Sequence, residues 1–543
     1  YNCWFVMDFN SLFTFERILT VALICISIGI ILSKLLKKRS SLSGPTNYPI
    51  IGNAIDFSPD NLVAAVKRYT QKYGNFFVMH MFSKRVIVIS DLDCILDILL
   101  RRPKYFRRSD ILDPIAKMLE QENSSFFAYG AHWSRLRRST TPPFNRKNVI
   151  DMSSSIWEEI KNTIHGLLNK ADGNGNICVD GKEELIRFTA SVLTVVAFGG
   201  EQPENVRKYC ISPLFFSDLR SIMRLAGQRA VTPIPDWLWN ISPFYFHFEK
   251  PGKAASNRLR SASNDIIAGY KAKIAFGNDT ISNKPKRAMK SLIETLVRMN
   301  EEADTQNTTG NRLSEEEIVS NIEGFFVAGT DTTAASLSFA LFYLSTHLKY
   351  TERAREEADR FFIKLKEFEQ ANIGNDNDAT ISQFIFDSVQ HDLPLCRAAM
   401  KETLRLVSPA SVLFMQSALS TPLILNHSND VEVFPSDMLM INVDACLRDP
   451  SVFIDPLSFL PDRWIENPTE LMEKSFVAFG GGPRQCPGMG LVMDLEAPLV
   501  IASMLHHFEI QVNCPVEEVQ RVFQFIMDIS KLPLILRRRN SAI

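Results

Sequence analysis

Residues 479–488 read Phe-Gly-Gly-Gly-Pro-Arg-Gln-Cys-Pro-Gly, and the interpretation of the whole chain starts from this stretch. A single cysteine, Cys486, stands between glycines and prolines, and an apolar run of helical length, residues 491–505, follows it. Glycines let backbone N–H groups crowd a sulfur atom without interference from Cβ atoms, and the start of a helix favours negative charge. The pattern therefore predicts a cysteine with a lowered pKa, presented as the thiolate that binds metals.

The composition of the chain limits the remaining possibilities. Its 543 residues include 60 Lys and Arg against 61 Asp and Glu, so the basic excess expected of a nucleic-acid-binding protein is absent. Hydrophobic residues make up 45% and charged residues 22%, which excludes bulk disorder and a multispanning membrane protein. The sequence contains no Cys-x-x-Cys pair and no zincin, P-loop or serine-hydrolase motif. We therefore expect one large folded body without a nucleic-acid partner.

An apolar segment precedes this body. Residues 18–36 are uncharged except for Lys34, whose side chain can snorkel, and the segment is long enough to span a bilayer. Basic residues follow up to Arg39, so the positive-inside rule predicts a cytosolic body. A removed signal peptide is the alternative, although such peptides carry their positive charge before the apolar run. We expect a membrane anchor over residues 1–39 with a transmembrane helix at about 18–36, a Pro/Gly connector over 40–53, and the folded body over 54–543.

Within the body, the spacing of apolar residues favours helix over most of the chain. Residues 149–168 and 185–198 have helical spacing, whereas residues 86–89 (Val-Ile-Val-Ile) indicate a short buried strand. The polar stretches 274–290 and 364–391 are interpreted as surface loops or insertions rather than linkers between separate cores. The fold class expected is mainly α with a small β-rich subdomain.

A second unusual stretch lies inside a long apolar helix. Ser314 is the expected N-cap, Glu317 closes a capping box, and the helix is expected to run to about His347. Its middle reads Ala-Gly-Thr-Asp-Thr-Thr over residues 328–333. Glycine costs about 1 kcal/mol relative to alanine in a helix, and threonine can bond a carbonyl one turn earlier. A stretch that weakens its own helix indicates a function that offsets the loss.

The cysteine stretch resembles the haem-binding loop of the cytochrome P450 family. The family pattern is Phe-x-x-Gly-x-Arg-x-Cys-x-Gly, and it is matched at Phe479, Gly482, Arg484, Cys486 and Gly488. The resemblance implies that Cys486 is the axial thiolate ligand of the iron of haem b and that Arg484 pairs with a haem propionate. It also implies the mainly helical haem-thiolate fold, with a small sheet-rich subdomain on the N-terminal side and residues 54–543 as the catalytic domain.

The resemblance extends to the long helix. Residues 328–333 match the family's oxygen-activation motif, which assigns Asp331 and Thr332 to the acid–alcohol pair that delivers protons to dioxygen.

A third match concerns structure. The sequence Lys-Glu-Thr-Leu-Arg-Leu around Glu402 and Arg405, followed downstream by Arg463, resembles the family's Glu-Arg-Arg triad. The spacing Glu-x-x-Arg alone is not specific, because it also occurs elsewhere in the chain. The family pattern has Glu where Asp462 stands and Phe where Trp464 stands.

A weaker match is Trp133-Ser-Arg-Leu-Arg137, similar to the family helix in which Trp and Arg face a propionate. Arg135 and Arg138 are expected to remain solvated and to help dock an acidic redox partner.

Many family members carry a further propionate-binding Arg about ten residues after the position of Arg405, where this chain has Met415 and Gln416. The substrate pocket is expected to be lined by residues 109–129, Asn321, Phe325, Ala328, 412–414, Phe525 and Ile526.

The function that the resemblance implies is that of a membrane-anchored monooxygenase. It would insert one atom of O2 into a lipophilic substrate, by default as a hydroxylation, with electrons from NADPH through a cytochrome P450 reductase and with cytochrome b5 as a further donor. The expected location is the endoplasmic reticulum membrane, with one span and a cytosolic body. A hydroperoxide or endoperoxide isomerase and a non-catalytic haem protein are the alternatives, and the complete Asp331 and Thr332 pair argues against both.

Overall fold

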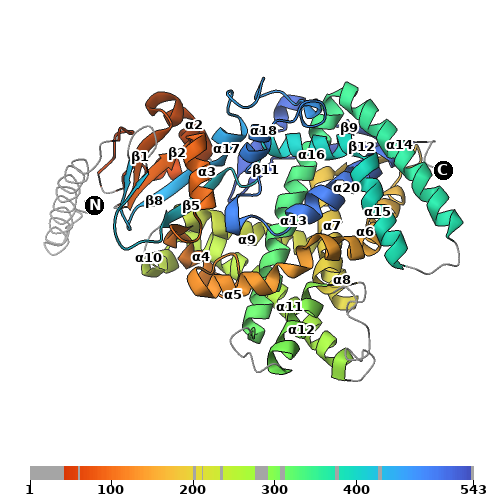
Figure 1. The fold of residues 1–543 in the computed structure, drawn as a ribbon, viewed down its shortest axis with the longest axis horizontal. Helices are drawn as coiled ribbons and strands as arrows, with labels where there is room; N and C mark the ends of the chain where they lie inside the picture. The colour runs from red at the N-terminus through yellow and green to blue at the C-terminus, as the bar shows by residue number, and fades with distance from the viewer. Residues whose placement is uncertain are drawn as a thin grey trace, which may run out of the picture.

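The computed structural model describes residues 42–49, 51–58, 61–82, 84–199, 204–210, 212–232, 236–275, 291–305, 312–372, 378–425 and 431–539. The expected transmembrane segment 18–36 and most of the stretch 274–290 lie outside these ranges. In Figure 1 a sheet occupies one end of the molecule, and the helices form the wider remainder. The mainly helical fold with a small β-rich part is confirmed.

The main sheet joins the N-terminal part of the body to two later strands. Its order is β1-β2-β8-β5-β3, with β1 (Phe76–Met81), β2 (Lys84–Ile89), β3 (Phe106–Arg108), β5 (Val412–Ser417) and β8 (Met438–Asn442). β2 pairs antiparallel with β1 and parallel with β8, where Val88 lies opposite Met440. Residues 86–89 are fully buried, as expected for a strand covered on both faces. The predicted strand is confirmed.

Three smaller sheets complete the β structure. One has the order β4-β12-β9 and the other two are hairpins, β10-β11 and β6-β7. Their bounds are β4 (Asn176–Asp180), β6 (Leu423–Leu425), β7 (Val431–Val433), β9 (Phe508–Val512), β10 (Arg521–Phe523), β11 (Met527–Ile529) and β12 (Pro533–Arg538).

The helices carry most of the buried apolar surface. They are η1 (Ala54–Phe57), α2 (Leu62–Tyr73), α3 (Leu92–Leu100), η2 (Asp110–Leu112), α4 (Asp113–Met118), α5 (Gly130–Thr140), η3 (Pro142–Phe144), α6 (Arg146–Leu168), α7 (Gly181–Phe198), α8 (Glu204–Cys210), α9 (Pro213–Val231), α10 (Asp236–Ile241), η4 (Tyr245–Glu249), α11 (Lys250–Ala275), α12 (Leu292–Thr305), α13 (Glu315–Thr346), α14 (Leu348–Ala371), α15 (Asp378–Asp392), α16 (Pro394–Leu406), α17 (Val443–Leu447), η6 (Pro461–Trp464), α18 (Glu470–Ser475), η7 (Gly482–Arg484), α19 (Met489–Leu491), η8 (Val492–Glu496), α20 (Ala497–His507) and η9 (Val516–Glu518). Both helices predicted from spacing, now α6 and α7, are present.

The long helix α13 lies at the centre of the molecule and begins as predicted. Ser314 Oγ accepts from the N–H of Glu317 at 3.1 Å, and Glu317 Oε2 accepts from the N–H of Ser314 at 2.9 Å. Two described helical stretches, α13 and residues 489–507, are long and apolar enough to span a membrane, but most of each is buried inside the protein. Both are therefore core helices.

The expectation of a loop over residues 364–391 is wrong. Residues 364–371 are the last turns of α14, and residues 378–391 belong to α15. The two helices pack through buried apolar side chains, and the rings of Phe368 and Phe384 stack with centroids 3.7 Å apart. The polar residues of this stretch cover the solvated faces of two amphipathic helices, which composition alone does not distinguish from a loop.

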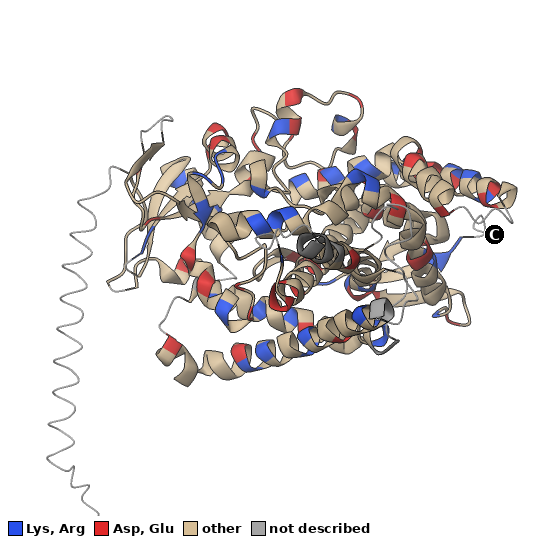
Figure 2. Cartoon of the chain, turned by 60° about the horizontal axis from the view of Figure 1, so that its bottom comes forward, with Lys and Arg blue, Asp and Glu red and all other residues tan. Residues whose placement is uncertain are grey.

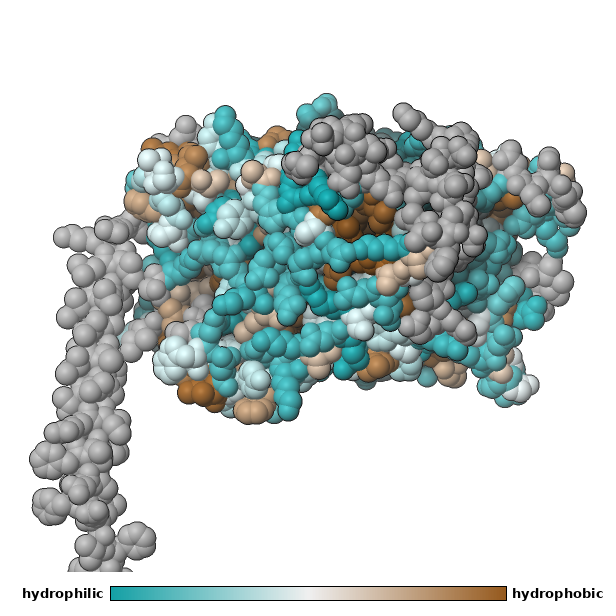
Figure 3. All heavy atoms as spheres, turned by 90° about the horizontal axis from the view of Figure 1, so that it is seen from below, coloured by the Kyte–Doolittle hydropathy of each residue, from teal (hydrophilic) through white to brown (hydrophobic). Residues whose placement is uncertain are grey.

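The charged side chains are distributed as the net charge predicts. Figure 2 shows Lys and Arg interspersed with Asp and Glu over the helices. Seen from below, the surface is mostly hydrophilic with small apolar patches (Figure 3).

Candidate functional site

The cysteine loop is closed by backbone hydrogen bonds. The N–H of Cys486 donates to the carbonyl of Phe479 at 2.9 Å, and the N–H of Gln485 donates to the carbonyl of Gly482 at 3.0 Å. Gly482 has φ +64°, and a Cβ atom there would lie 2.3 Å from the carbonyl oxygen of Leu99. Because any other side chain would clash with this backbone, the motif requires glycine at this position.

Opposing influences act on the pKa of the Cys486 thiol. The residue is exposed, and the N–H groups of Gly488 and Met489 and the charge of Arg137 act on its sulfur atom to lower the pKa. Burial outweighs these effects and raises the pKa of the thiol above its ordinary value. The prediction of a lowered pKa is therefore wrong for the protein chain alone, because the loop desolvates the sulfur more than its donors compensate.

Trp133, Arg137 and Arg484 meet beside this loop, as the resemblance implied. Arg484 stacks on the indole of Trp133, with 4.3 Å between its Cζ atom and the ring centroid, and donates to the carbonyl of Ala128 at 2.6 Å. Arg137 Nη2 donates to the carbonyl of Gln485 at 2.5 Å. Helix α5 and the cysteine loop are thus held together by two arginines.

Two further arginines, which the sequence analysis did not identify, complete a cluster of four. Burial, followed by the charges of Arg102, Arg108 and Arg137, lowers the pKa of Arg484 to about 9, and burial lowers that of Arg102 to about 10. Among the residues that the structure describes, the buried Nε atoms of Arg484 and Arg102 have no hydrogen-bond partner. Buried cations that repel one another and keep free donors fit an anionic group such as the two propionates of haem.

Arg108 occupies a position that bears on the missing family arginine. Strand β3 pairs with β5 so that Arg108 lies opposite Met415. Met415 and Gln416 stand where the resemblance leads one to expect a propionate-binding Arg. The guanidinium forms an ion pair with Asp113 at 2.7 Å and also donates to the carbonyls of Phe127 and Ser109. The strand pairing therefore supplies a cation next to the position at which β5 lacks one.

The middle of α13 borders an open space. Ala328 is exposed, although it lies in a core helix, and Thr332 is half-buried. The Thr332 hydroxyl donates to the carbonyl of Ala328 at 2.7 Å, which is the back-bond that its sequence position predicted. A hydroxyl group in this place can accept or donate a proton to a group bound in that space.

Asp331 has a strongly altered acidity. Burial raises the pKa of its carboxyl group to about 7, and the charge of Asp528 adds to this effect, whereas Lys182 and Arg220 act in the opposite direction. A carboxyl group with a pKa near the ambient pH can both release and regain a proton. This property agrees with the general-acid role expected of Asp331.

Glu402 and Arg405 form a fully buried ion pair. Arg405 donates to the two carboxylate oxygens of Glu402 at 2.9 and 2.7 Å, and both side chains have 0% exposure. The remaining N–H groups of Arg405 donate to the carbonyls of Leu447, Pro456 and Ser458. Arg463 adds a third contact from its Nε to Glu402 at 3.2 Å. The predicted triad is therefore assembled in space.

The two departures from the family pattern have their own partners. The indole N–H of Trp464 donates to Glu402 Oε2 at 2.8 Å, a bond that phenylalanine could not form. Asp462 receives two bonds from Arg353 of α14, at 2.8 and 2.9 Å. Trp464 thus belongs to the network around Glu402, whereas Asp462 ties η6 to α14.

Arg135 does not remain solvated as expected. It forms an ion pair with Glu317, the capping residue of α13, and Glu317 also contacts His132 at 3.0 Å. Helix α5 is thereby fixed to the start of α13, so Arg135 is engaged within the protein.

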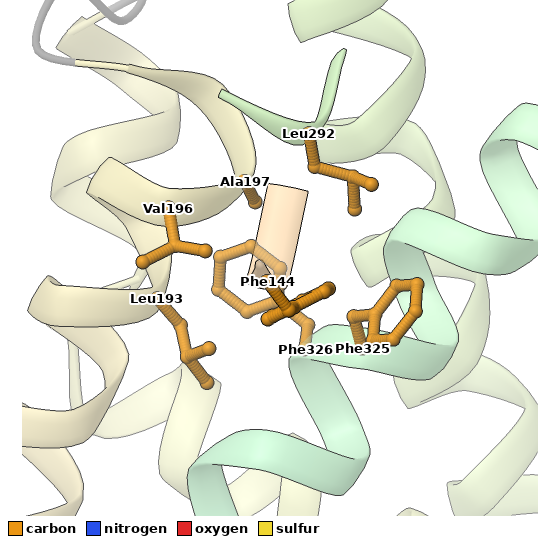
Figure 4. Close-up of a pocket in the computed structure, with 7 residues that line it drawn as sticks. All are labelled: Phe144, Leu193, Val196, Ala197, Leu292, Phe325 and Phe326. Atoms are coloured by element: carbon orange, nitrogen blue, oxygen red, sulfur yellow. The ribbon is translucent and has the colours of Figure 1, made fainter. Parts of the chain in front are cut away.

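Phe325 is a core contact in this structure. It lies 5.1 Å, between centroids, from Phe144 at a small apolar cavity between η3, α7, α12 and α13 (Figure 4). A larger cleft of about 530 Å³ lies elsewhere, and its lining includes residues of the segment 109–129 that was expected to face substrate: Asp110, Ile111, Asp113, Pro114 and Lys117. The cleft has room for a small organic molecule.

Comparison with known proteins agrees with these observations. A family model described as Cytochrome P450 matches residues 42–535. The chain is 22% identical to a trans-cinnamate 4-monooxygenase of Petunia hybrida over 98% of this chain and 100% of the relative, and 25% identical to tabersonine 16-hydroxylase 1 of Catharanthus roseus over 87% and 86%. It is also 24% identical to a self-sufficient cytochrome P450 monooxygenase of Penicillium freii, over 88% of this chain and 41% of that protein.

Proposed function

The chain belongs to the cytochrome P450 family and is a monooxygenase of that family, and from this premise we propose that it hydroxylates a lipophilic substrate with one atom of O2. The observation that carries the assignment to this site is the convergence of the Cys486 loop with four buried or half-buried arginines. One thiol ligand beside a cluster of cations, two of which keep buried Nε donors without a partner within the described residues, matches a haem with two propionates.

The residues that would hold the haem follow from this geometry. We propose Cys486 as the axial ligand, with Phe479, Gly482 and Gly488 shaping its loop, and Arg484, Trp133 and Arg137 beside the propionates. Arg102 and Arg108 extend the same cationic cluster. When bound, haem supplies the activation of O2.

The chain itself supplies protons for that chemistry. The Thr332 hydroxyl borders the open space at Ala328, and Asp331 adjoins it in the sequence with a pKa of about 7. We propose that the Thr332 hydroxyl would donate a proton from its Oγ1 atom to a group held beside it and that the Asp331 carboxyl would resupply that proton, so the two would act as a relay. The presence of both Asp331 and Thr332 favours the monooxygenase over an isomerase that rearranges a hydroperoxide or endoperoxide without external electrons.

Replacement of Thr332 by alanine tests the relay. The variant is expected to bind haem and substrate normally, but product per NADPH oxidised should fall about 100-fold while hydrogen peroxide accumulates, because only proton delivery is impaired. Simultaneous assays of NADPH, peroxide and product measure the coupling. The adjacent Thr333→Ala variant serves as the control, and unchanged coupling in Thr332→Ala would exclude the relay.

Substrate and electron donor are proposed from chemistry and relatives. The names of the hydroxylase relatives support hydroxylation. We propose a terpenoid, fatty-acid or sterol-like substrate because the pocket residues expected from the resemblance, such as Phe325, Ala328 and Phe525, are mostly apolar. We propose NADPH as the electron source through a cytochrome P450 reductase, with cytochrome b5 as a second donor.

We also propose that the body is cytosolic and held at the endoplasmic reticulum membrane by residues 18–36. The described surface offers a second contact, because Trp237, Ile241 and Phe246 on α10 and η4 are 67%, 72% and 62% exposed. Exposed aromatic and aliphatic side chains of this kind bind the interfacial region of a membrane.

Removal of residues 1–39 is therefore expected to weaken membrane association without abolishing it. In the truncated protein, Trp237→Ser with Ile241→Ser should release the remainder, while the haem content stays unchanged. Co-sedimentation with phospholipid vesicles measures the association. If the truncated protein lost its haem, residues 1–39 would be part of the folded body and the anchor assignment would be wrong.

A further inference from the structure

The cleft of about 530 Å³ is built from distant parts of the chain. Its lining comes from the turn between β1 and β2, from η2 and α4, and from α9 and α10. The apolar part of this lining consists of Met81, Phe82, Ile111 and Pro114. Met81 and Ile111 are buried, so they form a fixed apolar surface that can contact a hydrocarbon body.

Two ion pairs lie within the same lining. Lys84 pairs with Asp110, and Arg229 Nη2 lies 2.5 Å from Asp236 Oδ1. Arg229 also stacks on Trp239, with 4.9 Å between its Cζ atom and the ring centroid. Each pair is neutral as a unit, so neither adds a net charge to the cleft.

The third acid of the lining connects the cleft to the cysteine site. Asp113 lies 2.7 Å from a guanidinium nitrogen of Arg108, which is outside the lining. Arg108 donates to the carbonyl of Phe127, and Arg484 donates to the carbonyl of Ala128 at 2.6 Å. Because these two carbonyls belong to neighbouring residues, the Arg108–Asp113 pair joins the cleft to the arginine cluster beside the cysteine loop.

Lys117 is the remaining charge of the lining. It is exposed, and it forms no ion pair with any residue that the structure describes. The lining and Arg108 together carry four positive charges against three negative charges. A ligand with one negative charge would neutralise this excess, whereas a cationic ligand would increase it.

We propose that the cleft binds the carboxylate of a lipophilic acid, with Lys117 as its cation and the apolar lining against its hydrocarbon part. The proposal rests on the proposed function, because it narrows the lipophilic substrate to a carboxylic acid. Lysine presents a compact charge on a flexible stem, so it can follow a carboxylate at the edge of the cleft. An alcohol with the same alkyl chain lacks this contact and should bind more weakly.

Binding of dodecanoic acid and of dodecan-1-ol to the haem-loaded full chain in lipid nanodiscs tests the proposal. The two probes share one alkyl chain and differ in the head group. In Lys117→Met the dissociation constant of the acid should rise about fivefold, the effect of one solvated ion pair, while that of the alcohol stays constant. Lys117→Arg should keep the wild-type value, because it keeps the cation. Isothermal titration calorimetry, corrected with empty nanodiscs, measures both constants.

Lys67 provides a matched control. It is exposed on α2 and lies outside the cleft lining, so Lys67→Met should change neither dissociation constant. An unchanged constant for dodecanoic acid in Lys117→Met would overturn the proposal. An equal rise for both probes would overturn it as well, because the stem of the lysine and not its charge would then contribute to binding.

Hydroxylation is judged by a separate measurement, the analysis of products formed with NADPH and a cytochrome P450 reductase. If dodecanoic acid bound through Lys117 but gave no oxygenated product, the site would stand and the proposed hydroxylation of such acids would be wrong. If the acid bound and was hydroxylated equally well in Lys117→Met, hydroxylation would stand and the site would be wrong. The two failures are therefore distinguishable.

Discussion

Replacement of Cys486 by serine is expected to abolish the carbon monoxide band characteristic of thiolate-ligated haem. Serine keeps the size of the side chain and the backbone bond from Cys486 to Phe479, but its hydroxyl does not ionise at neutral pH and donates far less electron density to iron. Monooxygenase activity should fall below detection. The spectrum of the reduced protein under carbon monoxide, with haem content determined in parallel, measures the effect.

The chain offers a control for this experiment. Cys178 is exposed on β4, so Cys178→Ser should change neither the band nor the haem content. A band that persisted in Cys486→Ser would remove Cys486 as the ligand. A band that moved to the position of an oxygen- or nitrogen-ligated haem would confirm that the fold and the cofactor survive without the thiolate.

Local sequence signals predicted the parts of the site that short-range geometry determines. The capping box at Ser314 and Glu317 depends on residues in one turn of the chain, so its spacing was sufficient. Arg102 and Arg108 could not be predicted in this way. Their place beside Arg484 depends on the pairing of β3 with β5 and on the packing of the cysteine loop against α3.

Desolvation explains the other differences between expectation and structure. The hydrogen-bond donors around Cys486 can be identified in the sequence. The desolvation of its sulfur atom depends on how α5 and the loop pack, and this desolvation raises the pKa of the thiol. The prediction of a loop over residues 364–391 is wrong because it too ignored tertiary packing. The apolar residues of this stretch form the contact between α14 and α15, in which Phe368 stacks on Phe384, and this contact cannot be predicted from composition.

Replacement of Glu402 by alanine is expected to have the largest effect on stability. The change would leave Arg405 charged at 0% exposure, although three backbone carbonyls still accept from it, and would remove the acceptor of Arg463 and of the Trp464 indole. Breaking a buried pair by removing one partner costs about 3 to 5 kcal/mol. Most native domains are stable by only about 5 to 15 kcal/mol, so little folded holoprotein should accumulate.

A control with the same spacing separates this effect from the loss of any Glu-x-x-Arg pair. Glu352 precedes Arg355 on α14 but is exposed, and an exposed pair contributes only about 0.2 to 0.5 kcal/mol. Glu352→Ala should therefore keep the wild-type haem content and unfolding midpoint. Glu402→Gln should lie between the two, because its amide oxygen still accepts from Arg405 but carries no charge. If Glu402→Ala matched Glu352→Ala in urea unfolding and haem content, the buried network would not be what holds α16 to η6.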